Sequence, residues 1–146
     1  MPTYFVSAGM DQLTQSQKDA IAELITAAHS EEMSAPRYLV QVVFQPHPVG
    51  ARYIGAKPAP TPLIWVRGDV RAGRTREQRT RLLKRIAAEI ASVSGVQAHE
   101  VWVYINELAA DNMVEFGAVL PQPGRENEWL QSLSTRLRNY LSTLEE

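Results

Sequence analysis

The feature that most constrains the fold is a strand–helix–strand pattern that occurs twice along the chain. The segment Pro2-Thr3-Tyr4-Phe5-Val6 is matched sixty positions later by Pro62-Leu63-Ile64-Trp65-Val66. Both segments are short, and their aromatic and β-branched residues are typical of β-strands. A motif that recurs at a fixed offset indicates a duplicated structural unit.

Each copy also carries the start signal of a helix. Thr14-Gln15-Ser16-Gln17 and Thr75-Arg76-Glu77-Gln78 both place a hydroxyl at the N-cap and an amide three residues later, which is the form of a capping box. Behind each box, apolar residues recur at helical spacing, as expected for a helix that packs on a sheet. They are Ile21, Leu24, Ile25 and Ala28 in the first copy, and Leu82, Leu83, Ile86, Ile90 and Val93 in the second, where Gly95 is a suitable helix C-cap.

A second apolar run follows each helix, at residues 38–44 and 101–105, and closes the unit with another strand. Parallel strands joined through a helix require a right-handed crossover, so both helices should cover the same face of one sheet. The predicted fold class is therefore α+β. We expect a tandem β-α-β repeat that forms a four-stranded mixed sheet with two helices on one face, followed by a C-terminal helix.

The chain is expected to form a single domain over residues 1–146, because its length is usual for one domain. Residues 2–44 make up the first repeat and residues 63–106 the second. Residues 45–62 hold five of the nine prolines and are predicted to be a linker that crosses the surface.

The tail, residues 107–146, differs from both repeats. It has a turn at Leu120-Pro121-Gln122-Pro123-Gly124 and then one last helix. The apolar face of that helix is marked by Leu130, Leu133, Leu137, Leu141 and Leu144. A small sheet with one uncovered face and a protruding helix favour oligomerisation.

The composition excludes several classes of partner. A formal net charge of −1 leaves no basic excess for nucleic acid. No apolar run is long enough to span a membrane and no signal peptide is visible, so we expect a cytoplasmic protein without a membrane partner. The chain has no cysteine, and its three histidines lack metal-ligand spacing, so neither a metal nor a cofactor is expected.

The first candidate for chemistry is Pro2. Removal of Met1, which is usual before a small residue, turns the nitrogen of Pro2 into a secondary amine. An α-amino group has a reference pKa of roughly 7.7–8.0, so it can donate or accept a proton near neutral pH. We expect this nitrogen to be protonated near neutral pH.

Arg71 and Arg74 lie between the third strand and the N-cap Thr75. Two guanidinium groups beside a helix N-terminus are suited to binding a carboxylate. The alternative is a solvated basic stretch, since other arginines lie nearby. His29 falls near the end of the first helix, where a charged imidazole is favoured, but by default such a residue is a packing histidine.

Two further candidates lie in the second half of the chain. Tyr104 shares a strand face with Trp102, and either could be a core residue. Glu115 stands between Val114 and Phe116, an apolar setting that raises the pKa of a carboxyl group when the group is buried. An exposed position in the tail is the other interpretation.

Taken together, these residues resemble the tautomerase superfamily, through the N-terminal proline, the fused β-α-β units and the Arg71-x-x-Arg74-Thr75 motif. Three further segments narrow the resemblance to the cis-3-chloroacrylic acid dehalogenase group, and it extends from Pro2 to about Leu133. The segments are Val101-Trp102-Val103-Tyr104, Asn112-Met113-Val114-Glu115 and Leu120-Pro121-Gln122-Pro123-Gly124.

The resemblance implies a homotrimer that acts on a small carboxylate substrate. It implies Pro2 as the proton donor, with Arg71, Arg74 and His29 as contacts of the substrate carboxylate. It further implies that Tyr104 and Glu115 position and activate a water molecule. The implied reaction adds water to a cis-3-haloacrylate and yields malonate semialdehyde and halide.

Two alternatives stay open. Many members of the superfamily ketonise enols such as phenylenolpyruvate, with the N-terminal proline as a base. The same order of strands and helices would also suit a non-catalytic, ferredoxin-like module that holds a small carboxylate without turnover.

Overall fold

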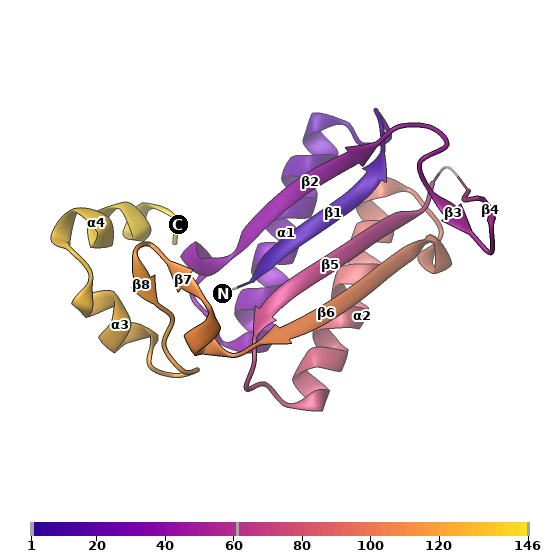
Figure 1. Cartoon of the computed structure of the whole chain (residues 1–146). Coiled ribbons are helices and arrows are strands. Elements are labelled where there is room, and N and C mark those ends of the chain that lie inside the picture. The colour runs from indigo at the N-terminus through magenta and orange to yellow at the C-terminus, as the bar shows by residue number, and fades with distance from the viewer. Residues whose placement is uncertain (1, 61, 146) are drawn as a thin grey trace.

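The computed structural model describes residues 2–60 and 62–145, and a four-stranded sheet of order β2-β1-β5-β6 lies at its centre. β1 pairs with β2 and β5 with β6 in parallel, whereas β1 and β5 are antiparallel. The two long helices, α1 and α2, cover one face of the sheet (Figure 1). The predicted tandem β-α-β fold is confirmed. The elements are β1 (Thr3–Gly9), α1 (Gln15–Met33), β2 (Gln41–His47), β5 (Ile64–Arg71), α2 (Arg76–Ser94) and β6 (Val101–Leu108).

Both helices start where the sequence predicts, and α2 also ends at its predicted cap. The hydroxyl groups of Thr14 and Thr75 accept hydrogen bonds from the third residue of each helix, and both capping boxes are complete. α2 ends at Gly95, which has a φ of 75°, a left-handed conformation that glycine adopts without strain.

The main core lies between the helices and the covered face of the sheet. Alternate residues of the two central strands point toward the helices, as the period of a strand requires. Among the buried residues here are Tyr4, Val6, Ile64 and Val66 from the strands, and Ile21, Ile25, Leu82, Ile86 and Ile90 from the helices.

In the described part of the chain, no helix covers the opposite face of the sheet (Figure 1). Trp102 and Tyr104 lie on it and are 39% and 53% exposed. The interpretation of these two residues as core is therefore wrong for the single chain. The ring of Tyr104 instead packs edge-on against Trp65, with 5.7 Å between the ring centroids.

The strand predicted at residues 38–44 begins later and ends later. Arg37–Leu39 form a single 3-10 turn, η1, and strand pairing starts where the N–H of Gln41 donates to the carbonyl of Pro2 at 3.0 Å. Leu39 is buried in a second core, so it is not available to the sheet. Within residues 45–62, the segments β3 (Tyr53–Ile54) and β4 (Lys57–Pro58) pair as a small hairpin.

The tail forms a separate layer beside one end of the sheet. The predicted C-terminal helix is present, but the apolar face expected from Leu130 to Leu144 is divided between two helices. Leu133 has an extended backbone, and the hydroxyl of Ser134 caps a new helix by accepting from the N–H of Leu137. The short elements that complete the chain are η2 (Ala98–Glu100), η3 (Ala110–Asn112), β7 (Val114–Glu115), β8 (Ala118–Val119), α3 (Glu126–Ser132) and α4 (Thr135–Thr143).

A second hydrophobic cluster holds the tail together and attaches it to η1. Leu39 joins side chains from the tail here, with Leu141 fully buried. The N–H of Tyr38 also donates to the carboxylate of Glu145 at 3.1 Å. The buried tail residues of the cluster are Ala110, Leu120, Trp129, Leu133 and Leu141.

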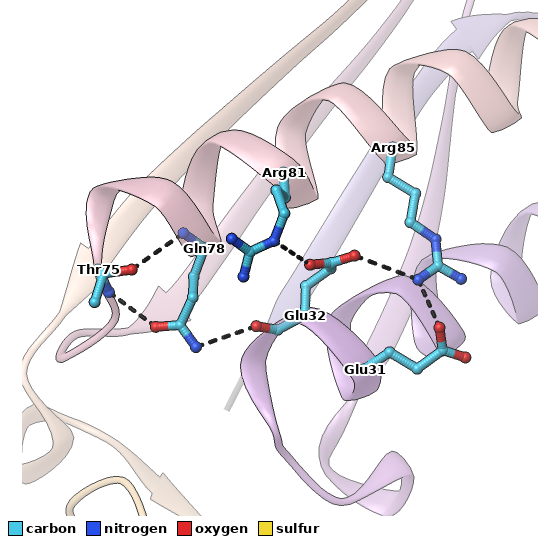
Figure 2. A network of polar contacts seen from close by, with 6 residues as sticks. All are labelled: Glu31, Glu32, Thr75, Gln78, Arg81 and Arg85. Atoms are coloured by element: carbon cyan, nitrogen blue, oxygen red, sulfur yellow. Dashed lines mark hydrogen bonds and ion pairs between the residues drawn. The ribbon is translucent and has the colours of Figure 1, made fainter.

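Polar contacts join the end of α1 to the start of α2 (Figure 2). The carboxylate of Glu32 binds Arg81 at 2.9 Å and Arg85 at 3.6 Å, and Arg85 also binds Glu31 at 2.6 Å. The side chain of Gln78, part of the second capping box, donates to the carbonyl of Glu32 at 3.3 Å. These contacts fix the two helix ends that border the site described next.

Among the described residues, no helix is long and apolar enough to cross a membrane.

Candidate active site

Four of the six predicted site residues line one pocket at the end of the sheet where β1 begins. β5 ends at this same edge because the two strands are antiparallel, with Thr3 opposite Asp69. The C-terminal part of α1 closes the pocket from the helix layer. The lining residues are Pro2, His29, Met33, Ala35, Val70, Arg71 and Arg74.

Arg71 is the last residue of β5, and its side chain is only 4% exposed. Nη1 donates to the carbonyl of Pro121 at 2.6 Å, and Nη2 is paired with the carboxylate of Glu126. Nε is buried and has no hydrogen-bond partner among the described residues. The tail thus holds two of the nitrogens of Arg71 and leaves the third available.

Arg74 follows in the turn before α2 and is half-buried. Its Nε donates to the carbonyl of Met33 at 2.8 Å, while Nη1 is buried and unpaired within the described part of the chain. Burial, followed by the nearby charge of Arg71, lowers the pKa of Arg74. Both arginines line the Pro2 pocket, and each has one buried nitrogen, Arg71 Nε and Arg74 Nη1, without a partner among the described residues. A buried donor without a partner is costly, so an acceptor ligand is favoured here.

His29 is 5% exposed, and its Nδ1 lies 2.7 Å from the hydroxyl of Tyr4. Burial, with a further contribution from the charge of Arg74, lowers the pKa of His29 to about 3. The imidazole is therefore neutral at neutral pH, and the charged state favoured by a helix end is not adopted. Desolvation outweighs the helix dipole at this position.

Glu115 and Tyr104 do not line the pocket. Glu115 is half-buried in β7, part of a hairpin whose Met113 and Ala118 pack on the second hydrophobic cluster beside η1, so it lies at the same end of the molecule as Pro2. Tyr104 lies in β6, where it lines a separate, open depression with Arg79 and Glu107.

The sequence interpretation missed two residues that contact the predicted ones. Glu126 is 7% exposed and pairs with Arg71, and Tyr4 is fully buried against His29. The strand alternation marks Tyr4 as an inward position, but no local pattern marks either pairing. The described residues contain no cluster of three histidine or acidic side chains arranged to hold a metal ion.

The family described as "Putative oxalocrotonate tautomerase enzyme" matches residues 1–133. No curated relative matches the chain significantly.

Solved structures include close matches in fold. The crystal structure of N1, a member of the cis-3-chloroacrylic acid dehalogenase (cis-CaaD) family, is 40% identical, covers 97% of this chain and 99% of its own, and superposes with a TM-score of 0.94. The structure of native Ps01740 is 28% identical, with coverage of 77% and 99% and a TM-score of 0.73.

A third match, the F6 fused 4-OT wild-type asymmetric trimer, is 20% identical, with coverage of 80% and 94% and a TM-score of 0.73, and shows the shared fold. The family match over residues 1–133 and the N1 match over almost the whole of both chains agree with one another. This chain belongs to the tautomerase superfamily and, within it, to the cis-3-chloroacrylic acid dehalogenase family.

Proposed function

We propose that this protein is an enzyme that uses the nitrogen of Pro2, freed by removal of Met1, to transfer a proton to a small unsaturated carboxylate. The observation that carries the proposal is that Arg71 and Arg74 both line the Pro2 pocket and each has a buried guanidinium nitrogen, Nε and Nη1, without a partner among the described residues. A carboxylate accepts such donors with charge-assisted hydrogen bonds. Neutral His29 adds a third polar contact without adding charge.

The proposed reaction is the addition of water to 3-substituted acrylate-type acids. With a cis-3-haloacrylate, the oxygen of water forms a bond to C3 while Glu115 takes one proton from that water, and Pro2 delivers its own proton to C2 as the double bond is consumed. The resulting halohydrin then loses halide from C3 and a proton from its hydroxyl group, which gives malonate semialdehyde. Arg71 and Arg74 hold the carboxylate so that C2 faces the nitrogen of Pro2, a positioning effect that accounts for much of enzymatic rate enhancement.

Water activation is assigned to Glu115 and Tyr104. Glu115 lies in a hairpin at the same end of the molecule as the pocket, whereas Tyr104 is exposed on the uncovered face of the sheet. An exposed aromatic side chain outside its own pocket is suited to acting in the pocket of a neighbouring copy. We therefore place the working enzyme in a homotrimer, the assembly named for the fused 4-OT relative.

Keto–enol tautomerisation with Pro2 as a base is the second candidate. It is favoured by the composition of the pocket, which contains the proton carrier and the carboxylate contacts but neither Tyr104 nor Glu115. Tautomerisation of an enol needs no added water, so these pocket residues would suffice for it.

The test of the proposal uses Arg74, because a change at Arg71 would also strand the buried carboxylate of Glu126. Arg74→Ala should reduce the stabilisation of the transition state for a carboxylate substrate by on the order of 2–5 kcal/mol. This loss is obtained from the ratio of the kcat/KM values of the unaltered protein and the variant. Arg76→Ala, an exposed change in the first turn of α2, is the matched control and should behave like the unaltered protein. Equal kcat/KM values in all three proteins would show that Arg74 does not bind the substrate.

A non-catalytic binding module would give a different pattern. It would bind 3-chloropropionate, the saturated analogue, in an Arg74-dependent way, but would turn over neither cis-3-chloroacrylate nor phenylenolpyruvate. The assay requires protein whose intact mass shows that Met1 has been removed, because a retained Met1 makes the nitrogen of Pro2 an amide.

A further inference from the structure

Tyr4 is the largest fully buried side chain beside the pocket that the proposed reaction does not use. Its ring lies under the helices, in β1, two residues after Pro2. The residue opposite it in β5 is Gly68, and a Cβ added there would come within 2.5 Å of Cε1 of the Tyr4 ring. The ring therefore occupies the space above Gly68 and can take this position only because no side chain stands there.

The ring position directs the phenol at His29. The hydroxyl oxygen lies 2.7 Å from Nδ1, and the two rings meet edge-on with an interplanar angle of 70°. Both groups are uncharged at neutral pH, since burial raises the pKa of Tyr4 far above its ordinary value and lowers that of His29 to about 3. One neutral group must therefore donate the proton of this hydrogen bond and the other must accept it.

Which group donates in the hydrogen bond between Tyr4 and His29 follows from whether the phenol proton has an acceptor. If Nδ1–H of His29 donated to Tyr4, the phenol proton would need a second acceptor, and among the described residues the Tyr4 hydroxyl has no other hydrogen bond. A buried hydroxyl left without an acceptor costs about 1–3 kcal/mol. If Tyr4 donates to Nδ1, the phenol proton is satisfied and the imidazole carries its single proton on Nε2.

We infer that Tyr4 is a positioning residue that fixes His29 as the Nε2–H tautomer and so gives the pocket a neutral N–H donor beside Arg71 and Arg74. The opposite tautomer would present a lone pair at Nε2, which repels a carboxylate. The contribution to substrate binding rests on the proposed function, whereas the tautomer itself does not. Gly68, through the space that it leaves for Tyr4, belongs to the same arrangement.

The experiment is a long-range 1H–15N spectrum of protein with 15N-labelled histidine, recorded near pH 7. The imidazole of His29 should show Nε2 protonated and Nδ1 unprotonated in the unaltered protein. Tyr4→Phe keeps the ring and removes the hydroxyl that donates to Nδ1 among the described residues, so Nδ1–H should become populated. Tyr140→Phe, which removes an exposed hydroxyl in α4, is the matched control and should leave the His29 signals unchanged.

Binding of 3-chloropropionate supplies a second readout that requires no turnover. Tyr4→Phe should weaken its binding by roughly 3- to 10-fold, the range expected for one hydrogen bond. A protonated Nδ1 in the unaltered protein would overturn the inference, and so would an unchanged tautomer and affinity in Tyr4→Phe. If the variant does not fold, the spectrum of the unaltered protein still decides the tautomer. A protein without enzymatic activity that shows the Nε2–H tautomer would defeat the proposed reaction and leave this inference standing.

Discussion

Glu126 holds Arg71 in a buried ion pair that joins the tail to the end of β5. The two residues are 55 positions apart in the sequence, and their side chains are 10% and 4% exposed. Arg71 also donates to the carbonyl of Pro121, so two contacts from the tail determine where its guanidinium group lies. The tail is thus part of the candidate active site, although its own residues do not line the pocket.

Removing the carboxylate of Glu126 should strongly destabilise the protein. Glu126→Ala leaves the charge of Arg71 buried without its partner, which typically costs about 3–5 kcal/mol, and urea denaturation would measure the loss. Glu126→Gln keeps an acceptor for Arg71 and should cost less. The matched control is Glu128→Ala in the same helix, since the side chain of Glu128 is 68% exposed and its ion pair with Arg125 lies at the surface. Similar losses in Glu126→Ala and Glu128→Ala would contradict the assignment.

The stability of the protein should fall in mild acid because of His29. Its pKa is about 3 in the folded protein and near 6.5 when unfolded, so between these values the unfolded chain binds a proton that the folded chain does not. Stability therefore decreases as the pH falls from about 6.5 toward 3, with a slope of at most about 1.4 kcal/mol per pH unit. Urea denaturation at pH 6 and pH 5 would measure this slope. At these pH values carboxylates contribute less to the pH dependence of stability than they do in stronger acid. His29→Gln should flatten the slope, whereas the same slope in both proteins would show that another group is responsible.

The sequence predicts the repeated unit well because its signals are local. Thr14 and Thr75 each meet their capping partner within one helical turn, and Gly95 ends α2 through its own backbone conformation. The tail is predicted less well, because the leucine spacing continues across Leu133 and Ser134 while the hydroxyl of Ser134 starts a new helix. Here a local cap competes with a longer apolar pattern, and the cap prevails.

Partners that are distant in the sequence could not be predicted. Nothing in the sequence near Glu126 indicates Arg71, and nothing near Tyr4 indicates His29, 25 positions away. Tyr104 shows a second reason why prediction fails. Strand alternation assigns Tyr104 to one face of the sheet, but it does not show whether other elements cover that face. Its exposure in the single chain is a property of the tertiary structure.

The two capping boxes provide a matched pair of variants. Thr14→Ala and Thr75→Ala each remove one N-cap hydroxyl and should each destabilise the protein by about 1 kcal/mol, measured by thermal or urea denaturation. Thr75 directly follows Arg74, so only its replacement should also shift Arg74 and raise KM for a carboxylate substrate. Thr14 lies at the N-terminus of α1, whereas the pocket residues His29 and Met33 lie near its C-terminus, so Thr14→Ala should leave KM unchanged. An equal rise in KM for both variants would mean that lower stability alone affects binding.

Glu115 should separate hydration from proton transfer. A positioned general base contributes about 10²–10⁴-fold, so Glu115→Gln should lower the rate of halide release from cis-3-chloroacrylate by roughly that factor. Ketonisation of phenylenolpyruvate needs no water and should be largely retained. Because both rates are measured on the same variant protein, the ketonisation rate is the control for the halide-release rate. Equal losses of both activities would reduce Glu115 to a structural or general electrostatic role.

The nitrogen of Pro2 is the centre of this account, and the most direct measurement compares Pro2→Ala with the unaltered protein after intact mass has shown that Met1 is absent from both. The rates of halide release from cis-3-chloroacrylate and of phenylenolpyruvate ketonisation are measured side by side. If Pro2 carries the proton, the faster of the two activities should fall by on the order of 10²-fold or more, while binding of 3-chloropropionate stays close to its original affinity. Undiminished turnover in Pro2→Ala would contradict the account, as would an unaltered protein that binds these acids and converts none of them.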